Sequence, residues 1–504
     1  MKQVKPRSLK LNYLFNLLNT ITLILIPLIL TPYLTRVLKS YGVGQYSYAL
    51  TICTYFTVLA SLGFNYYSQR EIAKYQDDRE TQTKVFYEIM ILKALTSTIC
   101  ILFYLTFLNI PYFSDYKVLL LILSFNIVSV LFDASFLFQG NEDFVTISLR
   151  NIIIRLLSFA SIFIFVKQSS DVWKYTLISS VTPLLAALLS FFLSRKYLVK
   201  IKLSNIRPFS HLKPCILLFI PTIAVSIYTM VDKIMLGTMV AGTVTLIENG
   251  VEITKKLSDI EIGQYDVVEK IPRMLVGFMS SLSLVLISRN TFYYKHNKIE
   301  ELKQTMIKSF QFIFFLSIPM VLGLVCISPI FSPLFFGIDF PKTTNLLVIL
   351  SFTIIFSGLN IVIGNQYFLA TNQDSKYIFS TVSGSIINIA LNFLLIPKFL
   401  SYGAAVASLL AEVSIFIIQS YLIKNVFSFK DIIRPIIKYL DAGLIMFLIL
   451  YPICGVMPTT IISTVIVVSV GIFSYTSSLI IFKEEFILRI ISFLKRFIVR
   501  KLRM

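Results

Sequence analysis

Long apolar runs, separated by short polar segments, recur along the whole chain. A transmembrane helix needs about 20 mostly apolar residues, and about fourteen segments meet this requirement. We therefore expect an all-α polytopic membrane protein. The expected spans are residues 12–34, 46–67, 86–108, 118–138, 148–166, 174–194, 214–237, 265–288, 310–336, 343–370, 377–397, 403–423, 437–457 and 459–482.

One connecting segment has a different periodicity. Between the spans 214–237 and 265–288, the stretch VTLIENGVEIT alternates apolar and polar residues around Asn249-Gly250. Asn-Gly between alternating runs is a strong signal for a β-hairpin. We expect a small hairpin on the outer face, within an insertion at 238–262. It is either a solvated ornament or an element that gates transport or touches substrate.

Composition agrees with a membrane location. Of the 504 residues, 56% are hydrophobic and 14% are charged, whereas an average soluble domain has roughly 25% charged residues. The net charge of +20 comes from 46 Lys and Arg against 26 Asp and Glu. Most basic residues fall in alternate connecting segments, as expected of cytoplasmic loops. Both termini are therefore expected in the cytoplasm, with a basic tail lying on anionic lipid, and no nucleic-acid partner is expected.

Few residues suit catalysis or metal binding. The five cysteines lie in apolar stretches without CxxC spacing, and the two histidines, His211 and His296, lie in polar connections. No GxxxxGK phosphate-binding loop occurs. We therefore expect no disulfide, no metal and no cofactor, and we do not expect an enzyme.

Two short echoes indicate an internal repeat. Gly44-Gln45-Tyr46 recurs as Gly263-Gln264-Tyr265, and FLFQGNED at 136–143 resembles YFLATNQD at 367–374. Each pair falls at matching positions in two sets of six spans, which predicts two parallel, pseudo-symmetric six-helix lobes. The expected organisation is an N-terminal lobe at 1–195, a cytoplasmic loop at 196–213, a C-terminal lobe at 214–424, two extra helices at 425–482 and a basic tail at 483–504.

Several motifs, in this order, carry a resemblance to a known family. They are PYLTRVLKSYGVGQYSYA (32–49), SQREIAK (68–74), FLFQGNEDF (136–144), VDKIMLG (231–237), GQYDVVEKI (263–271), and INIALNFLLIPKF with GAAVASLLAE (387–412). Over roughly residues 10–425 the chain resembles the Wzx-type polysaccharide flippases, whose superfamily also holds the MATE drug exporters and the lipid II flippase. The insertion at 238–262 departs from this pattern, because the family normally has a short turn there.

The resemblance implies a transporter of the bacterial plasma membrane. Its substrate would be an undecaprenyl-diphosphate-linked oligosaccharide, moved between leaflets by alternating access for surface polysaccharide or capsule synthesis. Membrane lipids, H⁺ or Na⁺, and a polysaccharide polymerase with other assembly proteins are the implied partners. The family has an Arg closing the first span and another after the second, which Arg36 and Arg70 match.

Three charges inside the N-terminal spans form a candidate substrate site. Counting helical rise places Lys93, Asp133 and Arg155 at similar depth, about 8–10 Å inside the cytoplasmic boundary. Charges at such depth normally face a bundle interior or a water-filled cavity. The two cations would receive the diphosphate, with Asp133 holding a cation when the site is empty. The alternative is a structural salt bridge between helices.

Other functions remain open at this level. A MATE-like ion-coupled exporter of drugs or other small molecules would share the fold but would favour acidic groups in its cavity. A membrane polymerase or glycosyltransferase would need a catalytic group on a sizeable outer loop. Glu412, near the middle of its span, is either a proton- or sodium-coupling group or a side chain paired within its lobe. The two helices at 437–457 and 459–482 either line a groove for the polyprenyl tail or buttress the C-terminal lobe.

Overall fold

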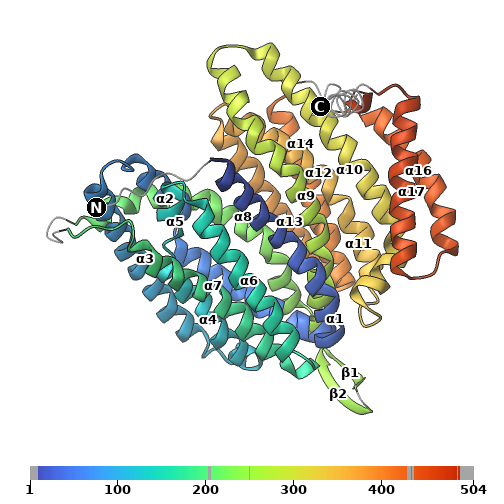
Figure 1. Ribbon diagram of the computed structural model, residues 1–504. Coiled ribbons are helices and arrows are strands. Elements are labelled where there is room, and N and C mark those ends of the chain that lie inside the picture. Colours follow the sequence, from blue (N-terminus) through green and yellow to red (C-terminus); the bar gives the residue numbers. More distant parts are fainter. Residues whose placement is uncertain are drawn as a thin grey trace, which may run out of the picture. The chain divides into compact units, whose positions relative to one another are not determined.

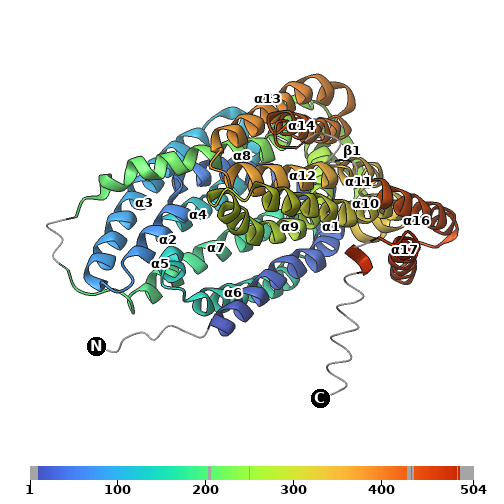
Figure 2. The same cartoon turned by 90° about the horizontal axis from the view of Figure 1, so that it is seen from above.

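The computed structural model describes residues 9–201, 206–248, 250–427, 433, 436–484 and 486–488. The chain folds into two compact units, unit 1 at Met1–Gly263 and unit 2 at Gln264–Met504. Both units are built from long helices, and one two-stranded sheet lies in unit 1 (Figures 1 and 2). The basic residues of the N-terminal arm at 1–8 and of the tail at 489–504 lie outside the described residues. The lobe boundaries expected at 196–213 and 425 stay predictions.

In its described residues, unit 1 has eight helices ahead of the sheet. Between the helices, short 3₁₀ turns occur at Pro111–Tyr116 (η1), Ser169–Asp171 (η2) and Pro208–His211 (η4). The helices are α1 (Leu9–Ser61), α2 (Phe64–Lys74), α3 (Arg79–Phe107), α4 (Lys117–Phe132), α5 (Ser135–Gly140), α6 (Phe144–Phe165), α7 (Val172–Ser194) and α8 (Leu212–Met239).

Helix α1 contains two of the expected spans. Its 53 residues would reach about 80 Å if straight, more than twice the roughly 30 Å of hydrocarbon in a bilayer. The backbone leaves the helical conformation at Lys39, where φ is 59° and ψ is 176°. This kink lies between residues 12–34 and 46–67, so each half of α1 has the length of one crossing.

The predicted β-hairpin is confirmed. Strands β1 (Thr243–Glu248) and β2 (Val251–Lys256) pair antiparallel, with Thr243 opposite Lys256 and Leu246 opposite Ile253. Gly250 has φ of 79°, the left-handed conformation that a tight turn requires and glycine adopts readily, while Asn249 lies outside the described residues. The Leu257 amide donates to the Gly242 carbonyl at 3.0 Å, which closes the base of the hairpin.

Helix α9 (Leu257–Lys295) begins in unit 1 and crosses a glycine of α1 at very close range. A Cβ on Gly44 would lie 1.7 Å from the Asp259 carbonyl oxygen, and one on Gly263 would lie 1.9 Å from that of Ser40. Each glycine therefore faces the carbonyl four residues before the other glycine. Gly44 and Gly263 are also the equivalent residues of the sequence repeat, so the crossing is locally symmetric.

Unit 2 continues with helices that pack around a large apolar cluster. Its helices are α10 (Ile299–Phe336), α11 (Thr343–Ser351), α12 (Thr353–Ile361), a π-helical segment η5 (Val362–Leu369), α13 (Asp374–Phe399), α14 (Ser401–Leu422), α16 (Ile436–Val456) and α17 (Ile461–Ile481). Buried Met446, Leu450 and Val467 of α16 and α17 belong to the same cluster as Phe310 and Phe314 of α10. The last two helices are therefore part of unit 2 and pack against α10.

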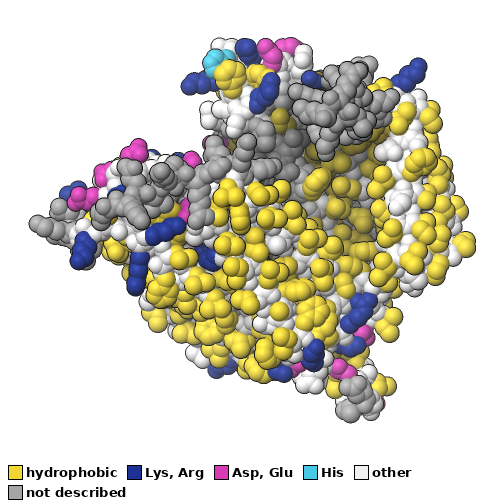
Figure 3. All heavy atoms as spheres, in the orientation of Figure 1, with side chains coloured by type: hydrophobic (Ala, Val, Ile, Leu, Met, Phe, Trp, Pro, Cys, Tyr) yellow, Lys and Arg dark blue, Asp and Glu magenta, His cyan; other side chains and the backbone are white. Residues whose placement is uncertain are grey.

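The helices have surfaces suited to lipid. Large apolar side chains such as Phe103 and Phe473, 69% and 74% exposed, project from the bundles, and hydrophobic side chains cover most of the visible helix surface in Figure 3. In the described part of the chain, 11 helices are long and apolar enough to cross a membrane. The protein is thus a multi-pass membrane protein, as expected. Helices α8 and α9 overlap two further expected spans; the total of fourteen stays a prediction.

Candidate functional site

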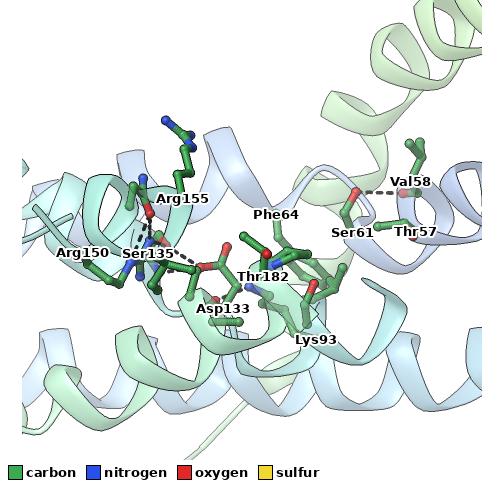
Figure 4. A pocket seen from close by; sticks show the side chains of 17 residues that line it. Thr57, Val58, Ser61, Phe64, Lys93, Asp133, Ser135, Arg150, Arg155 and Thr182 are labelled. Atoms are coloured by element: carbon green, nitrogen blue, oxygen red, sulfur yellow. Dashed lines mark hydrogen bonds between the residues drawn. The ribbon is translucent and has the colours of Figure 1, made fainter. Parts of the chain in front are cut away.

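A cavity of about 500 Å³ lies among α1, α3, α4, α6 and α7 of unit 1 (Figure 4). Lys93, Asp133 and Arg155, selected from sequence by their depth, all line it. Arg150, which was not predicted from the sequence, is a fourth charged residue of the lining. The remaining lining side chains are Thr57, Val58, Ser61, Phe64, Ser129, Val130, Ser135, Asn151, Ile154, Thr182, Pro183, Ala186 and Ala187.

The expected span 118–138 is broken at this cavity. Helix α4 ends at Phe132, Asp133 has extended backbone angles of −69° and 105°, and α5 begins at Ser135. Non-helical backbone is tolerated at membrane depth only where it is buried in protein or lines a water-filled cavity. Here the freed groups find side-chain partners. The Lys93 ammonium donates to the Asp133 carbonyl, and the Ala134 amide donates to the Ser190 hydroxyl at 3.1 Å.

Lys93 is therefore held by the backbone carbonyl of Asp133, and the role expected of the Asp133 carboxylate in the empty site stays a prediction. Its side chain is 2% exposed, and its ammonium also lies 5.2 Å from the centre of the Phe136 ring. The ammonium stabilises the broken helix and is buried away from solvent. Lys93 therefore gives the cavity positive charge but is not a freely available hydrogen-bond donor for a ligand.

The Asp133 carboxylate is held by the residue that starts α5. Its Oδ1 accepts from the Ser135 amide at 3.0 Å and from the Ser135 hydroxyl. Ser135 in turn accepts from Arg150 Nη2 at 3.2 Å, and Arg150 also donates to Asn151 Oδ1 at 2.9 Å. Ser135 thus links the side chains of Arg150 and Asp133 through hydrogen bonds, as Figure 4 shows.

Arg155 is the more available guanidinium. It donates to the backbone and side-chain oxygens of Asn19 at 3.3 and 3.0 Å, both through Nη1. Figure 4 shows its side chain extending away from the group around Asp133. Its Nε and Nη2 have no hydrogen-bond partner among the described residues. Arg155 therefore keeps donors that an anionic ligand can use.

The charges of the cavity do not balance. Among its lining residues Lys93, Arg150 and Arg155 are cationic and Asp133 is the one carboxylate. Cations confined at low dielectric attract an anion more strongly than they would in water. Guanidinium groups also match the geometry of phosphate oxygens. The cavity is chemically suited to a phosphate-bearing or otherwise anionic group.

The two arginines matched from the family pattern lie elsewhere. Arg70 lines a second, more open pocket of about 630 Å³ together with Asn16, Gln69 and Gln139. Arg36 is exposed on α1 and donates to the Pro32 carbonyl at 2.6 Å. Neither residue lines the cavity around Asp133, and their roles in binding stay predictions.

Glu412 lies in unit 2, on α14, and is paired. Its Oε2 accepts from Asn360 Nδ2 at 2.6 Å, and the same amide contacts the Glu412 carbonyl at 3.1 Å. A coupling role for this carboxylate is untested. In the described part of the chain no group of three or more His, Cys, Asp or Glu side chains is placed to hold a metal ion.

Comparison with known families identifies the class of protein. Residues 9–287, more than half of the chain, match the family described as "Polysaccharide biosynthesis protein". The chain belongs to this family, which confirms the resemblance found in the motifs.

Individual relatives agree with this assignment. The chain is 23% identical over 406 residues to the "Putative O-antigen transporter" of Escherichia coli K12, covering 80% of this chain and 93% of that protein. It is 22% identical over 174 residues to the "Probable low-salt glycan biosynthesis flippase Agl15" of Haloferax volcanii, covering 34% of this chain and 37% of that one.

Solved structures show the same fold. The inward closed conformation of the lipid II flippase MurJ superposes with a TM-score of 0.70 at 19% identity, covering 94% of this chain and 100% of that one. An inward-facing MATE multidrug transporter of the MOP superfamily gives a TM-score of 0.58 at 12% identity, covering 77% of this chain and 95% of that one. The expected MATE-like helical fold is confirmed.

Proposed function

We propose that the protein is a flippase that moves an undecaprenyl-diphosphate-linked oligosaccharide across the bacterial plasma membrane for surface polysaccharide synthesis. Membership of the polysaccharide biosynthesis protein family and similarity to a protein named as an O-antigen transporter support this role. The observation that carries it is the cavity of unit 1, where three cations outnumber one carboxylate within a multi-pass membrane protein.

The cavity residues have distinct parts in this proposal. The diphosphate binds the free donors of Arg155 and is attracted by the charge of Arg150. Lys93 adds positive charge while it holds the broken backbone at Asp133. The negative charge of the Asp133 carboxylate repels the diphosphate and offsets part of the attraction of the cations. The diphosphate is therefore bound reversibly and can leave on the other side.

The polar side chains of the same cavity have a second part. Ser129, Ser135, Asn151 and Thr182 line it beside the charges. Their hydroxyl and amide groups offer donors and acceptors to the sugar nearest the diphosphate. Transport by alternating access needs no covalent chemistry, so the protein acts as a transporter and not as an enzyme.

The cavity favours this role over drug export. A site for cationic drugs would need an excess of acidic groups, whereas this cavity has three cations and one carboxylate. Coupling to H⁺ or Na⁺ through Glu412 and association with a polysaccharide polymerase belong to the same proposal. Neither is needed for the diphosphate to bind.

Deleting the protein tests the function directly. In a strain that lacks it, the lipid-linked oligosaccharide should accumulate on the cytoplasmic side of the membrane, and surface polysaccharide should be lost. Accumulation of the same lipid on the outer leaflet would contradict a flippase and would indicate a later step.

Substitution of Arg155 tests the site. Arg155→Ala should abolish transport and Arg155→Lys should reduce it, because an ammonium keeps the charge but loses the planar pair of donors. Lys117→Ala is the matched control, since Lys117 is an exposed cation at the start of α4 and does not line the cavity. Membrane levels are compared by immunoblot. Normal transport by a well-folded Arg155→Ala variant would overturn the site assignment.

A further inference from the structure

The hairpin formed by β1 and β2 is fastened to the helices of unit 1. The Tyr41 hydroxyl donates to Glu248 Oε2 at 2.8 Å, and the Lys255 ammonium lies 4.5 Å from the centre of the Tyr41 ring. On the neighbouring side, Lys256 Nζ lies 2.7 Å from Asp115 Oδ2. These contacts come from both strands, so the hairpin is a fixed part of unit 1 and not a loose loop.

The fastened hairpin covers a second cavity, here called the hairpin pocket. The pocket has a volume of about 480 Å³ and lies between the hairpin, the part of α1 that follows the kink at Lys39, and the starts of α4 and α7. The hairpin is at the opposite end of unit 1 from α2 and α5, as Figure 1 shows. The lining residues are Tyr41, Gln45, Asp115, Val118, Leu119, Ser169, Ser170, Val172, Trp173, Glu248, Ile253 and Lys255.

The lining combines an aromatic side chain with hydrogen-bonding groups. Trp173, the one tryptophan of the chain, is 46% exposed, whereas Tyr41 is 4% exposed and the Lys255 ammonium lies over its ring. Gln45, Ser169 and Ser170 add amide and hydroxyl groups. A sugar ring presents apolar C–H faces and a rim of hydroxyl groups, which match an aromatic face and a set of donors and acceptors.

The lining of the hairpin pocket lacks the excess of cations that the inner cavity has. Asp115 and Glu248 are anionic and Lys255 is the one cation of its lining. Burial by itself would raise the pKa of Glu248, but hydrogen bonds from Ser169 and Tyr41 and the nearby ammonium groups of Lys39 and Lys255 lower it below its usual range. The carboxylate is therefore ionised, and its oxygens can accept hydrogen bonds from the hydroxyl groups of a sugar.

We propose that the hairpin pocket binds the saccharide portion of the transported lipid on the outer side while the diphosphate is still in the cationic cavity. This inference rests on the proposed flippase function and adds a second binding site to it. Trp173 precedes Thr182 of the cationic cavity by nine residues on α7, a separation of about 14 Å. An oligosaccharide of a few rings spans that distance.

Trp173 supplies a direct test, because its fluorescence reports on this pocket alone. The purified full-length protein is titrated in detergent micelles with soluble saccharides. The probes are maltotriose, cellotriose, triacetylchitotriose, and single repeat units released by mild acid from the surface polysaccharide of the source bacterium. The repeat unit should shift or quench the Trp173 emission saturably. Inorganic diphosphate at the same concentrations should leave it unchanged.

Two hairpin variants provide the matched comparison. Ile253 lines the pocket, whereas Ile247 is 77% exposed and pairs with Glu252, one position further along the ladder and so on the other face. Ile253→Arg should weaken the saccharide response at least tenfold, and Ile247→Arg should leave it as in the natural protein. Equal elution volumes in size-exclusion chromatography check that both variants fold.

Three results would overturn the inference. These are no response to any of the saccharides, an unchanged response in Ile253→Arg, or a response to diphosphate like that to the repeat unit. None of them depends on transport, so a failure here leaves the flippase proposal to the Arg155 and deletion experiments. If those experiments failed while Trp173 responded, the pocket would stand as a saccharide site without the transport role.

Discussion

Lys93 shows how a cation can be stabilised within the membrane by backbone. An ammonium buried without a partner is costly, and this one donates to the carbonyl that the end of α4 leaves free at Asp133. The nearby Phe136 ring adds a cation–π contact. The Asp133 carboxylate therefore accepts its hydrogen bonds from Ser135 and not from Lys93. Arg155 keeps the most accessible donors of the cavity.

Asp143 offers a second residue whose charge can be tested, outside the membrane spans. Its carboxylate begins α6 by accepting from the Thr146 amide at 3.3 Å, and it also accepts from Lys196 at 2.6 Å and Tyr197 at 2.9 Å. Burial by itself would raise the pKa of Asp143, but the hydrogen bonds from Lys196, Thr146 and Tyr197 outweigh it and lower the pKa below its ordinary value.

The sign of the pH dependence follows from that lowered pKa. A carboxylate with a lowered folded-state pKa adds stability above its unfolded-state pKa, about 3.9, and loses this contribution as the pH falls through the folded-state value. We expect Asp143→Asn to cost about 1.5–3 kcal/mol at pH 7, as is usual for hydrogen bonds to a charged group. Thermal unfolding in detergent, followed by circular dichroism, measures the difference.

The neighbouring residue is the control for this prediction. Glu142 is exposed, and Glu142→Gln should leave the unfolding temperature nearly unchanged. The destabilisation of Asp143→Asn relative to the natural protein should shrink as the pH is lowered below about 4. A constant difference between the two proteins from pH 7 to pH 3 would show that the charge of Asp143 contributes nothing.

Sequence periodicity could locate some cavity residues and not others. Lys93, Asp133 and Arg155 stand out because each is a charge well inside an apolar run. Arg150 precedes Arg155 by five residues, so the two side chains point about 140° apart around an ideal helix. A search for a single polar helix face would therefore not assign both residues to one site. They line the same cavity because α4 is broken at Asp133, and no breaking residue in the run 118–138 marks that point.

At the scale of elements, the crossing of α1 and α9 depends on two glycines. Any side chain at Gly44 would overlap the Asp259 carbonyl, since its Cβ would lie 1.7 Å from that oxygen. The clash is with backbone, which a rotamer change cannot relieve. The helices must separate or shift to accept even a methyl group.

Gly44→Ala should therefore destabilise unit 1 strongly. Overpacking of this kind typically costs about 1–3 kcal/mol, and occasionally more, so we expect a lower unfolding temperature and less protein in the membrane. Gly277→Ala is the matched control on α9, because nothing lies within 4 Å of its added Cβ. Alanine favours a helix there. Equal unfolding temperatures for the two variants would contradict the close crossing.

The repeat that suggested two equivalent segments could be read from sequence, but its structural reason could not. Gly44-Gln45-Tyr46 and Gly263-Gln264-Tyr265 are similar in letters alone. The structure shows that the two glycines face one another's helices at close range. Hydropathy shows which segments enter the membrane. A close contact between two backbones is marked in the sequence only by a glycine, which does not identify its partner.

At the scale of the whole molecule, orientation is the prediction with the widest consequences. We expect the hairpin outside and the α9–α10 connection in the cytoplasm. A background without Cys53, Cys100, Cys215, Cys326 and Cys454, all of them free thiols, allows single cysteines to be labelled. Glu252→Cys should react with a membrane-impermeant maleimide in intact cells, and Lys298→Cys should react only after permeabilisation.

Each of the two cysteine variants has its own control, which is labelling in permeabilised cells. Both residues are exposed, so each should be labelled in permeabilised cells, which rules out burial as the cause of a negative result. The reverse pattern would invert the topology and would place the hairpin pocket on the cytoplasmic side.

Hydropathy and the Asn-Gly signal thus predict most of the architecture. A segment that crosses the bilayer core has to form an apolar helix, and the short alternating stretch around Asn-Gly does not have the pattern of such a helix. The cavities were harder to predict. The hairpin pocket depends on contacts such as Tyr41 with Glu248, which are separated by 207 residues. Nothing in the local pattern around either residue identifies the other, so the pocket became visible only in the folded chain.

The closed base of the hairpin has an evolutionary consequence. The Leu257 amide and the Gly242 carbonyl meet at 3.0 Å, so substitutions or insertions beyond that point can alter the strands without displacing α8 or α9. If the hairpin pocket binds the saccharide as proposed, the strands can change with the sugar of the substrate while the cationic cavity is left unaltered. Grafting this short segment onto a relative that has a short turn at this position would then change the glycan preference of that relative.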